Sequence, residues 1–536
     1  MRRPLALLLT LVLVAGAAGS AHARRLAPAG PNATFVITGH GWGHGVGMSQ
    51  YGAYGFAQHG FTYQKILTHY FTGTQIGPAP VSKVRVLLAS GQTKLKLVSA
   101  DDFTVRDGTG ATHDVTAGTY TLASPLKLKA DNSAKAKAMP GPLLFQPGPS
   151  PLTLGRRYRG SIQVDVEGGK LRAINVVGLE QYLYGVVPSE MPFSWAPEAL
   201  KAQAVVARSY ALATKHSGAF DLYPDTRSQM YLGVDHEKPS TNAAVDATAG
   251  KVVLYNGQVA KTYFYSTSGG RTASSADVWG AAIPYLVSVS DPYDTISPYH
   301  TWGPYSFGGA ELGKLLRAGG AVQDVHTALN SSGRVTTLTA LTATAQRTFD
   351  ATALRKLLGL RSTWFSVGVM SLSAPGSAVT YGSTTRLAGV ARGIAGVTLQ
   401  QRASVGAWQA VGPMKPAPDG SLRVAVRPTA TTDYRLVSGK VDGATAHVVV
   451  APLVRLVPPR TQQELRGTAR PAIAGAAVTV QRLQGASWTT VARTTLEANG
   501  AFAAQLQLTA GTYRARVAPG HGLVPGTSRV LQVSTS

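Results

Sequence analysis

Alternating polar and apolar positions mark an early stretch of the 536-residue chain as strand-forming. Three segments of this stretch alternate in side-chain character or are rich in β-branched residues, with Gly and Pro between them: 84–88, 94–98 and 162–166. Short runs of this kind, bounded by turn residues, are typical of β-strands. We therefore predict a small β-rich region over about 83–177.

A helix is predicted next, from about 194 to 214. Ser194 is the predicted N-cap, and Pro197 lies in the first turn, where proline is tolerated. Apolar residues recur on one face, which predicts that the helix packs against a sheet. These residues are Leu200, Ala204, Ala207 and Ala211.

An internal repeat occupies the chain beyond Pro375. The segment VTLQ at 397–400 is echoed 81 residues later by VTVQ at 478–481. Three single residues recur at offsets of 79 or 80: Trp408 as Trp488, Gly420 as Gly500, and Tyr434 as Tyr513. Steady spacing with alternating strands predicts two tandem Ig-like β-sandwich modules, over 376–455 and 456–536. Wall binding and an inert stalk are both open as their role.

The first 23 residues have the pattern of a signal peptide. Arg2 and Arg3 precede an apolar run from Leu5 to Ala18, and a small-residue AHA triplet follows at 21–23. A membrane anchor is the alternative, but the run is shorter than a bilayer span requires. We predict an exported, soluble protein that acts in the cell wall, without a later membrane span.

The charge balance changes the expected partners. The chain has 51 basic and 26 acidic side chains, a formal charge of +25. An exported protein seldom meets nucleic acid, so anionic cell-envelope polymers are the expected partners of this charge. The absence of cysteine excludes disulfides, a thiol nucleophile and a cysteine zinc site.

Glu190 is the leading candidate for chemistry. It lies among Val186, Val187, Met191, Pro192, Phe193 and Trp195 in the sequence. A carboxyl group buried among such neighbours has a raised pKa, as a general acid near neutral pH requires. A carboxylate that favours the start of the following helix is the alternative interpretation.

Several separated motifs resemble one family. They are VPSEMP at 187–192, EALKAQAVVARSY at 198–210, QMYLG at 229–233, YSTSGGRT at 265–272, DVWG at 277–280 with PYL at 284–286, and LGLRSTWF at 358–365. GWGHGVGMSQYGA at 41–53 and ILTHYFTGT at 66–74 belong to the same set. Together they resemble the SpoIID/LytB domain family of stage II sporulation protein D and amidase enhancers, over about 34–370.

The block at 41–74 closes the domain in the usual family arrangement, whereas here it opens it. This order is interpreted as a circular permutation, which is tolerated when termini lie close together at the surface. The resemblance implies an α+β, β-rich fold, with the SpoIID-like domain over 34–370 followed by the two Ig-like modules.

The resemblance also implies an activity, that of a lytic transglycosylase. Such an enzyme cleaves the MurNAc–GlcNAc bond of peptidoglycan without water and leaves 1,6-anhydro-MurNAc ends. Glu190 would act first as acid and then as base, so one carboxyl group suffices where other glycosidases use two. The alternative is a non-catalytic, peptidoglycan-binding enhancer of a partner amidase.

Fixed polar groups and aromatic faces are needed to hold sugar hydroxyl and acetamido groups. The candidate substrate-binding residues are Gln203, Arg208, Tyr210, Gln229, Tyr231, Ser266, Ser268, Gly269, Gly270, Arg271, Thr272, His44, Ser49 and Gln50. Structural alternatives stay open: Gln203 and Tyr210 could cap a sheet edge, 268–270 could be a tight turn, and His44 could be a hydrogen-bonded structural group.

No cofactor or metal is predicted. His40 and His44 have a metal-pair spacing only on a helix, and the glycines around them argue against one. Some family members carry a Cys and His zinc site near the segment that here is 221–229, and this chain has no cysteine there.

Overall fold

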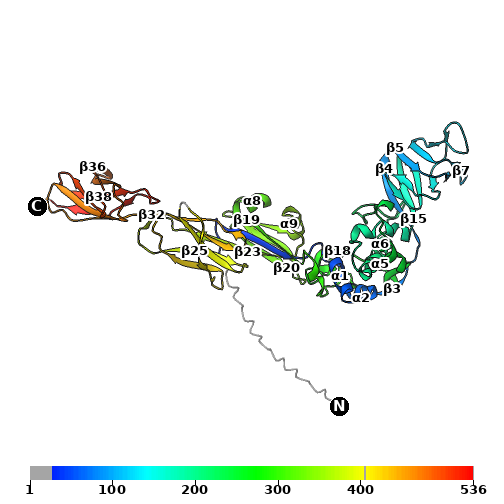
Figure 1. Ribbon diagram of the computed structural model, residues 1–536, viewed down its shortest axis with the longest axis horizontal. Helices are drawn as coiled ribbons and strands as arrows, with labels where there is room; N and C mark the ends of the chain where they lie inside the picture. The colour runs from blue at the N-terminus through cyan, green and yellow to red at the C-terminus, as the bar shows by residue number, and fades with distance from the viewer. Residues whose placement is uncertain (1–26, 404–405, 535–536) are drawn as a thin grey trace, which may run out of the picture.

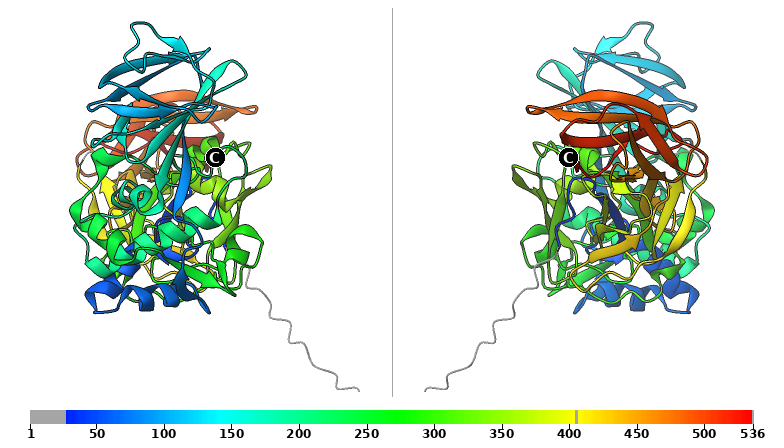
Figure 2. Two further views of the ribbon diagram at one scale, coloured as in Figure 1. Left: turned by 90° about the vertical axis from the view of Figure 1, so that its right-hand side faces the viewer. Right: turned by 90° about the vertical axis from the view of Figure 1, so that its left-hand side faces the viewer.

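The computed structural model describes residues 27–403 and 406–534. They form an elongated row, with a β-rich region at one end, a helical part beside it and strand-rich units running to the C-terminus (Figure 1). Figure 2 views this row from its two ends. The predicted signal peptide lies outside the described residues. None of the helices in 27–403 and 406–534 is long and apolar enough to cross a membrane.

Two sheets build the β-rich region, one of six strands in the order β4-β15-β14-β11-β6-β7 and one of four in the order β13-β12-β5-β8. Their bounds are β4 Lys83–Gln92, β5 Lys94–Ser99, β6 Phe103–Arg106, β7 Thr112–Val115, β8 Gly118–Ala123, β11 Leu143–Gln146, β12 Leu152–Leu154, β13 Arg156–Tyr158, β14 Ser161–Glu167 and β15 Lys170–Gly178. The short strands β9 (Lys127–Leu128) and β10 (Lys137–Ala138) pair with each other. The three predicted strand segments lie in β4, β5 and β14, which confirms that prediction.

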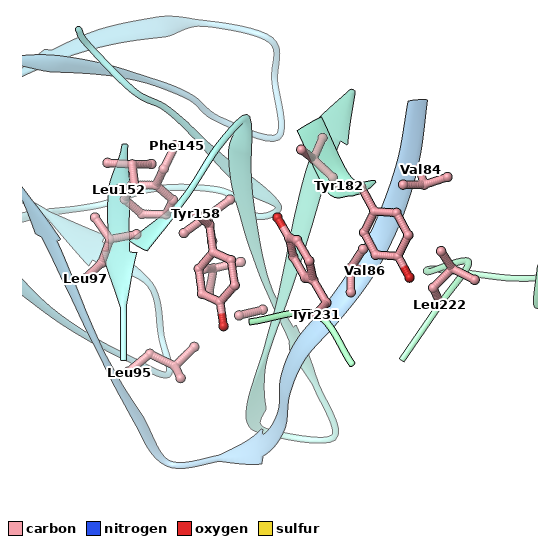
Figure 3. Close-up of a cluster of buried hydrophobic side chains, with 14 of the residues drawn as sticks. Val84, Val86, Leu95, Leu97, Phe145, Leu152, Tyr158, Tyr182, Leu222 and Tyr231 are labelled. Atoms are coloured by element: carbon pink, nitrogen blue, oxygen red, sulfur yellow. The ribbon is translucent and has the colours of Figure 1, made fainter. Parts of the chain in front are cut away.

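Tyrosine rings line the core of this region where it meets the helices (Figure 3). The ring centroids of Tyr231 lie 5.0 Å from Tyr182 and 5.5 Å from Tyr158. A buried tyrosine needs a partner for its hydroxyl. Tyr231 has one, because it donates to Asn175 Oδ1 of β15 at 2.9 Å. The loop that carries Tyr231 is thereby fixed to the sheet.

Most of the helices lie in the part of the row next to the β-rich region (Figure 1). Their bounds are α1 Gln50–Gln58, α2 Tyr63–Tyr70, α3 Leu179–Tyr184, α4 Val187–Glu190, α5 Pro197–Ala213, α6 Pro239–Ala247, α7 Ser275–Trp279, α8 Gly309–Leu316 and α9 Ala351–Leu357, with 3-10 turns η1 Val234–His236 and η2 Asp294–Ile296. α5 connects two cores. Ala204, Ala207 and Ala211 join the core of the β-rich region, while Leu200 and Val205 join a second core built with α1 and α2. The predicted contact of this helix with a sheet is confirmed.

The predicted N-cap of this helix is wrong. α5 begins at Pro197, its N-cap is the extended residue Ala196, and no side chain caps it. Proline suits the first helical position, because its fixed φ is already helical and it has no N–H that would need a partner. Ser194 lies before the cap and does not perform that role.

The strands of the N-terminal block pair with strands from much later in the chain. β1 (Thr34–His40) pairs on one side with β19 (Thr301–Gly308) and on the other with β23 (Phe365–Ser373). β2 (Met48–Ser49) runs parallel to β18 (Phe264–Tyr265). β3 (Gln75–Pro78) pairs with β16 (Lys251–Tyr255), which also pairs with β17 (Gln258–Val259). Residues 34–78 therefore complete a unit whose other strands come from 251–373.

The sheet of β1 extends into the predicted first module. Its order is β19-β1-β23-β25-β28, with β25 at Thr385–Arg392 and β28 at Ser421–Val426. The predicted boundary at 370–376 therefore falls within one sheet, and the exact domain limits stay a prediction. A three-stranded sheet, β20 (Asp324–Leu329), β21 (Val335–Leu341) and β22 (Gln346–Asp350), lies beside it with α9.

The repeat recurs in the structure. Tyr434 in β29 and Tyr513 in β38 are both buried, and an arginine lies over each repeated tryptophan. The remaining strands are β24 Val379–Thr380, β26 Val397–Ala403, β27 Gln409–Pro413, β29 Thr432–Ser438, β30 Val441–Asp442, β31 Ala446–Val448, β32 Val450–Ala451, β33 Leu453–Leu456, β34 Glu464–Arg470, β35 Ala477–Gln484, β36 Ser487–Thr495, β37 Ala501–Gln505, β38 Gly511–Ala518, β39 Gly526–Thr527 and β40 Leu531–Val533.

Candidate active site

Glu190 lies at the end of α4, a four-residue helix between α3 and α5. The residue is half-buried, and burial raises the pKa of its carboxyl group. One hydrogen bond, from the Met230 backbone N–H to Oε1 at 3.4 Å, works in the opposite direction. The net effect is a raised pKa, as the apolar sequence neighbourhood predicts.

Three glutamine side chains lie near Glu190, and one of them contacts its backbone carbonyl group rather than its carboxylate. Gln50 Nε2 donates to the Glu190 carbonyl oxygen at 2.8 Å and to Gln203 Oε1 at 3.4 Å. Gln229, next to Met230, accepts a hydrogen bond from the Tyr182 hydroxyl at 3.3 Å. The structure therefore brings together candidates from the N-terminal block, from α5 and from the 229–233 motif.

Two side-chain amide donors of these glutamines have no hydrogen-bond acceptor among the described residues. They are the Nε2 atoms of Gln203 and Gln229, and both are buried. Buried polar groups in folded proteins are nearly always paired, so unpaired ones require an explanation. Amide donors held beside a carboxyl group are the kind of groups that bind the hydroxyl or acetamido oxygens of a sugar.

Tyr210 lies on the same face of α5 as Gln203, seven residues on. Its ring is half-buried and lies 5.8 Å from that of Tyr263. Burial is the main cause of the raised pKa of Tyr210, and the nearby Glu190 adds to it. Tyr210 is therefore a neighbour of the candidate acid, as a substrate-binding role requires.

The Ser268-Gly269-Gly270 segment is a tight turn held by a buried carboxylate. Asp294 Oδ2 accepts hydrogen bonds from Ser268 Oγ and from the Gly269 backbone N–H, both at 2.8 Å. Its other oxygen lies 2.9 Å from His300 Nδ1. The structure supports the turn interpretation for this segment, and it shows Asp294 as a residue that the sequence patterns missed.

A second buried carboxylate lies next to this turn. The Asp291 backbone N–H donates to the Gly270 carbonyl, and Asp291 Oδ1 accepts from the Tyr70 hydroxyl at 2.8 Å. Burial raises the pKa of Asp291 to about 6. It too was missed by the sequence patterns, because Tyr70 and Asp291 are far apart in the chain.

Replacing Gly269 with Ala should destabilise this turn. Gly269 has a φ of +79°, and a Cβ there would lie 2.6 Å from His40 Cβ and 2.7 Å from the Gly41 nitrogen. We expect the free energy of unfolding to fall by about 2–4 kcal/mol, the sum of strained backbone and overpacking. The measurement is urea denaturation.

Gly280→Ala is the matched control, because Gly280 has a φ of +75° and open space around the Cβ position. Its free energy of unfolding should fall only by the cost of the strained backbone, about 1 kcal/mol. Equal losses in the two variants would contradict the close packing of the turn against His40.

Two candidates, Arg208 and Tyr231, lie inside the protein. The Arg208 guanidinium is fully buried and pairs with Glu180, while the Tyr231 hydroxyl is bonded to Asn175. Thr272 is also buried, and its hydroxyl oxygen accepts from the Val289 N–H at 2.8 Å. These three side chains serve the framework in this structure, so we leave them out of the proposed substrate contacts.

Three further candidates differ in their exposure and in their hydrogen-bond partners. Ser49 is the N-cap of α1 and accepts from the Gly52 N–H at 3.1 Å. Ser266 is half-buried, with its hydroxyl 3.2 Å from that of Thr267. Arg271 is exposed, and its Nε donates to Ser288 Oγ at 2.8 Å.

His44 lines a cavity of about 370 Å³ together with Asp277, Trp279 and Arg355. Burial lowers the pKa of His44 to about 4, so the ring is neutral at pH 7. Its Nδ1 accepts from the Val46 N–H at 3.1 Å, which places the ring proton on Nε2. Within residues 27–403 and 406–534, no cluster of three His, Asp or Glu side chains could hold a metal ion.

Comparison with known proteins places part of this region in a known family. The family model of SpoIID, the stage II sporulation protein, matches residues 167–255, the stretch that carries Glu190, Gln203, Tyr210 and Gln229. This match confirms, over residues 167–255, the resemblance to the SpoIID/LytB family that the motifs predict. Its sequence is 41% identical over 112 residues to the amidase enhancer of Bacillus subtilis, a match that covers 21% of this chain and 15% of the enhancer.

Other relatives match over a similar share of this chain. Stage II sporulation protein D of Bacillus subtilis is 34% identical over 145 residues, covering 24% of this chain and 42% of that protein. An uncharacterised protein of Brachyspira hyodysenteriae is 39% identical over 139 residues, covering 25% and 38%. The matches span less than half the length of each relative. A two-domain fibronectin type III segment of chicken tenascin aligns at 13% identity and a TM-score of 0.20, covering 31% of this chain and 97% of the segment, a likeness too weak to bear on the fold.

Proposed function

We propose that the chain is an exported lytic transglycosylase that cleaves the MurNAc–GlcNAc bond of peptidoglycan. The observation that carries this proposal is the environment of Glu190, a half-buried carboxyl group with a raised pKa beside two buried amide donors that have no partner among the described residues. The family relationship supports a role at the cell wall.

Glu190 would serve both halves of the reaction. Its protonated carboxyl group gives a proton to the glycosidic oxygen as the bond from that oxygen to C1 of MurNAc breaks, which frees the 4-hydroxyl of GlcNAc. The C6 hydroxyl oxygen of MurNAc then bonds to C1, and its proton passes to the Glu190 carboxylate. The ring closure yields a 1,6-anhydro end, restores the acid and consumes no water.

A single carboxyl group satisfies this scheme. Hydrolytic glycosidases need a second carboxylate near the first as nucleophile or base. The Gln203 and Gln229 amide groups would instead bind and orient the sugar, since each has an unused donor.

The competing function is a non-catalytic enhancer of a wall amidase, which the similarity to the Bacillus subtilis amidase enhancer favours. Purified protein and its Glu190→Gln variant should be incubated with cell walls, alone and together with a wall amidase. The transglycosylase proposal expects anhydro-muramic ends from the wild type alone and none from the variant. Undiminished amidase stimulation by the variant, without any anhydro ends from the wild type, would establish the enhancer function instead.

The proposed location is outside the cytoplasm, at the wall. Loss of Arg2 and Arg3 with the signal peptide would leave a side-chain charge of +23 on the remaining chain. This excess would concentrate the protein on anionic envelope polymers through an attraction that salt weakens.

A further inference from the structure

Three aromatic side chains form a row that leads away from Glu190. The ring of Tyr210 lies 5.8 Å from Tyr263, and the ring of Tyr263 lies 4.4 Å from Trp279. The rings come from α5, from the residue before β18 and from α7. None of the three is fully buried, and Trp279 is 41% exposed. Tyr263 also packs against the core that α5 shares with α1 and α2, whereas the exposed ring of Trp279 is accessible to a ligand.

The row has a defined beginning and end. At one end Tyr210 shares a helix face with Gln203, which is linked through Gln50 to Glu190. At the other end the ring of Trp279 lies 5.6 Å from His44 and forms part of the wall of the 370 Å³ cavity. The row therefore runs from the neighbourhood of the candidate acid to the cavity that His44 lines.

The polar groups along this path identify the class of ligand. The cavity wall is mixed, with Trp279 beside Asp277, Asn330 and Arg355, and the Lys261 ammonium lies 5.2 Å from the centre of the Tyr263 ring. An apolar peptide would cover these groups and the unused Gln203 and Gln229 donors without pairing them, at a large desolvation cost. A sugar chain presents both C–H faces for the rings and hydroxyl oxygens for the polar groups.

We propose that Tyr210, Tyr263 and Trp279 are the binding track for the glycan units on one side of the bond cleaved at Glu190, and that this track ends in the His44 cavity. The inference rests on the proposed function and deepens it, because it makes the substrate a strand of several sugar units. Tyr263 and Trp279 then become substrate-binding residues in addition to those that the sequence predicts.

The test compares Trp279→Ala with Trp279→Phe in a Glu190→Gln background, which binds without cleaving. The probes are peptide-free glycan strands and a peptide-free disaccharide, with binding measured by calorimetry. Trp279→Ala should bind the long strands about tenfold more weakly, a loss of ~1.4 kcal/mol. Trp279→Phe should retain most of the affinity, and binding of the disaccharide next to Glu190 should not change. Phe61→Ala is the control, because Phe61 is similarly exposed at 36% and lies outside the row.

The outcomes distinguish failure of the binding track from failure of the proposed function. Unchanged strand binding in Trp279→Ala, with strand binding intact in the parent, would overturn the track and leave the proposed function standing. A parent that binds no glycan, together with a wild type that produces no anhydro ends, would overturn both. Equal losses in Trp279→Ala and Phe61→Ala, or lowered thermal stability of both Trp279 variants, would show a structural role and also overturn the track.

Discussion

Glu190→Gln is expected to lower the rate of anhydro-muramic end formation by about 10²- to 10⁴-fold, the contribution of a positioned general acid and base. An amide cannot give its proton to the glycosidic oxygen or take one from the C6 hydroxyl. Folding should be unaffected, because the carboxylate accepts only the long hydrogen bond from the Met230 N–H, which an amide oxygen can also accept. Rates of product formation and thermal unfolding of the two proteins would be compared.

Glu198→Gln is the matched control for this variant. Glu198 lies in the first turn of α5, where it accepts from the Tyr63 N–H at 2.7 Å and pairs with Lys201. It is another partly exposed glutamate near the same helix, so its replacement should leave the rate within a few-fold of the wild type. A loss of the same size in both variants, or full activity in Glu190→Gln, would contradict the assignment of the acid.

The second large effect concerns stability at Arg208. Arg208→Met should reduce the free energy of unfolding by about 3–5 kcal/mol, the usual result of removing one partner of a buried ion pair. The guanidinium is 0% exposed and pairs with Glu180, and it also donates to the Lys251 carbonyl oxygen at 2.9 Å. Without it, the Glu180 carboxylate and the Lys251 carbonyl oxygen would lose their partner. The measurement is urea unfolding, with hydrogen exchange on α5 to locate the effect.

Two further variants make this prediction specific. Arg227→Met removes an exposed ion pair with Asp225, and should reduce stability by less than about 1 kcal/mol. Arg208→Met combined with Glu180→Met removes both the buried guanidinium and its partly exposed partner, and should recover part of the loss. A loss below 1 kcal/mol in the single Arg208 variant would show that this guanidinium does not hold α5 to α3 and α6.

The sequence was informative wherever one segment contained the whole pattern. The alternation in β4, β5 and β14 predicts strands, and the apolar face of α5 predicts a packed helix, because each depends on neighbours within a few residues. The apolar surroundings of Glu190 likewise lie within a few residues of it, and the direction of its pKa shift follows from them. The start of α5 was missed because Pro197 at the first helical position, and not the capping-type residue Ser194, marks where the helix begins.

The rest of the site depends on contacts between distant segments. Asp294 holds Gly269, which lies 25 residues earlier, and Gln50 reaches Glu190 across 140 residues. Arg208 belongs to a motif that resembles the family, yet only the packing shows that its guanidinium faces Glu180 inside the protein. Tyr263 and Trp279 could not be joined into a row from sequence, because ring contacts between a strand end and a short helix leave no periodic signal.

The most direct test of the account is digestion of peptidoglycan glycan strands by the purified protein in water labelled with heavy oxygen, with the products read by mass spectrometry. The proposed reaction predicts muramic ends that are lighter by one water than hydrolysed ends and that carry no heavy oxygen. Reducing ends that carry the heavy oxygen, or strands left intact by active, folded protein, would contradict a transglycosylase centred on Glu190.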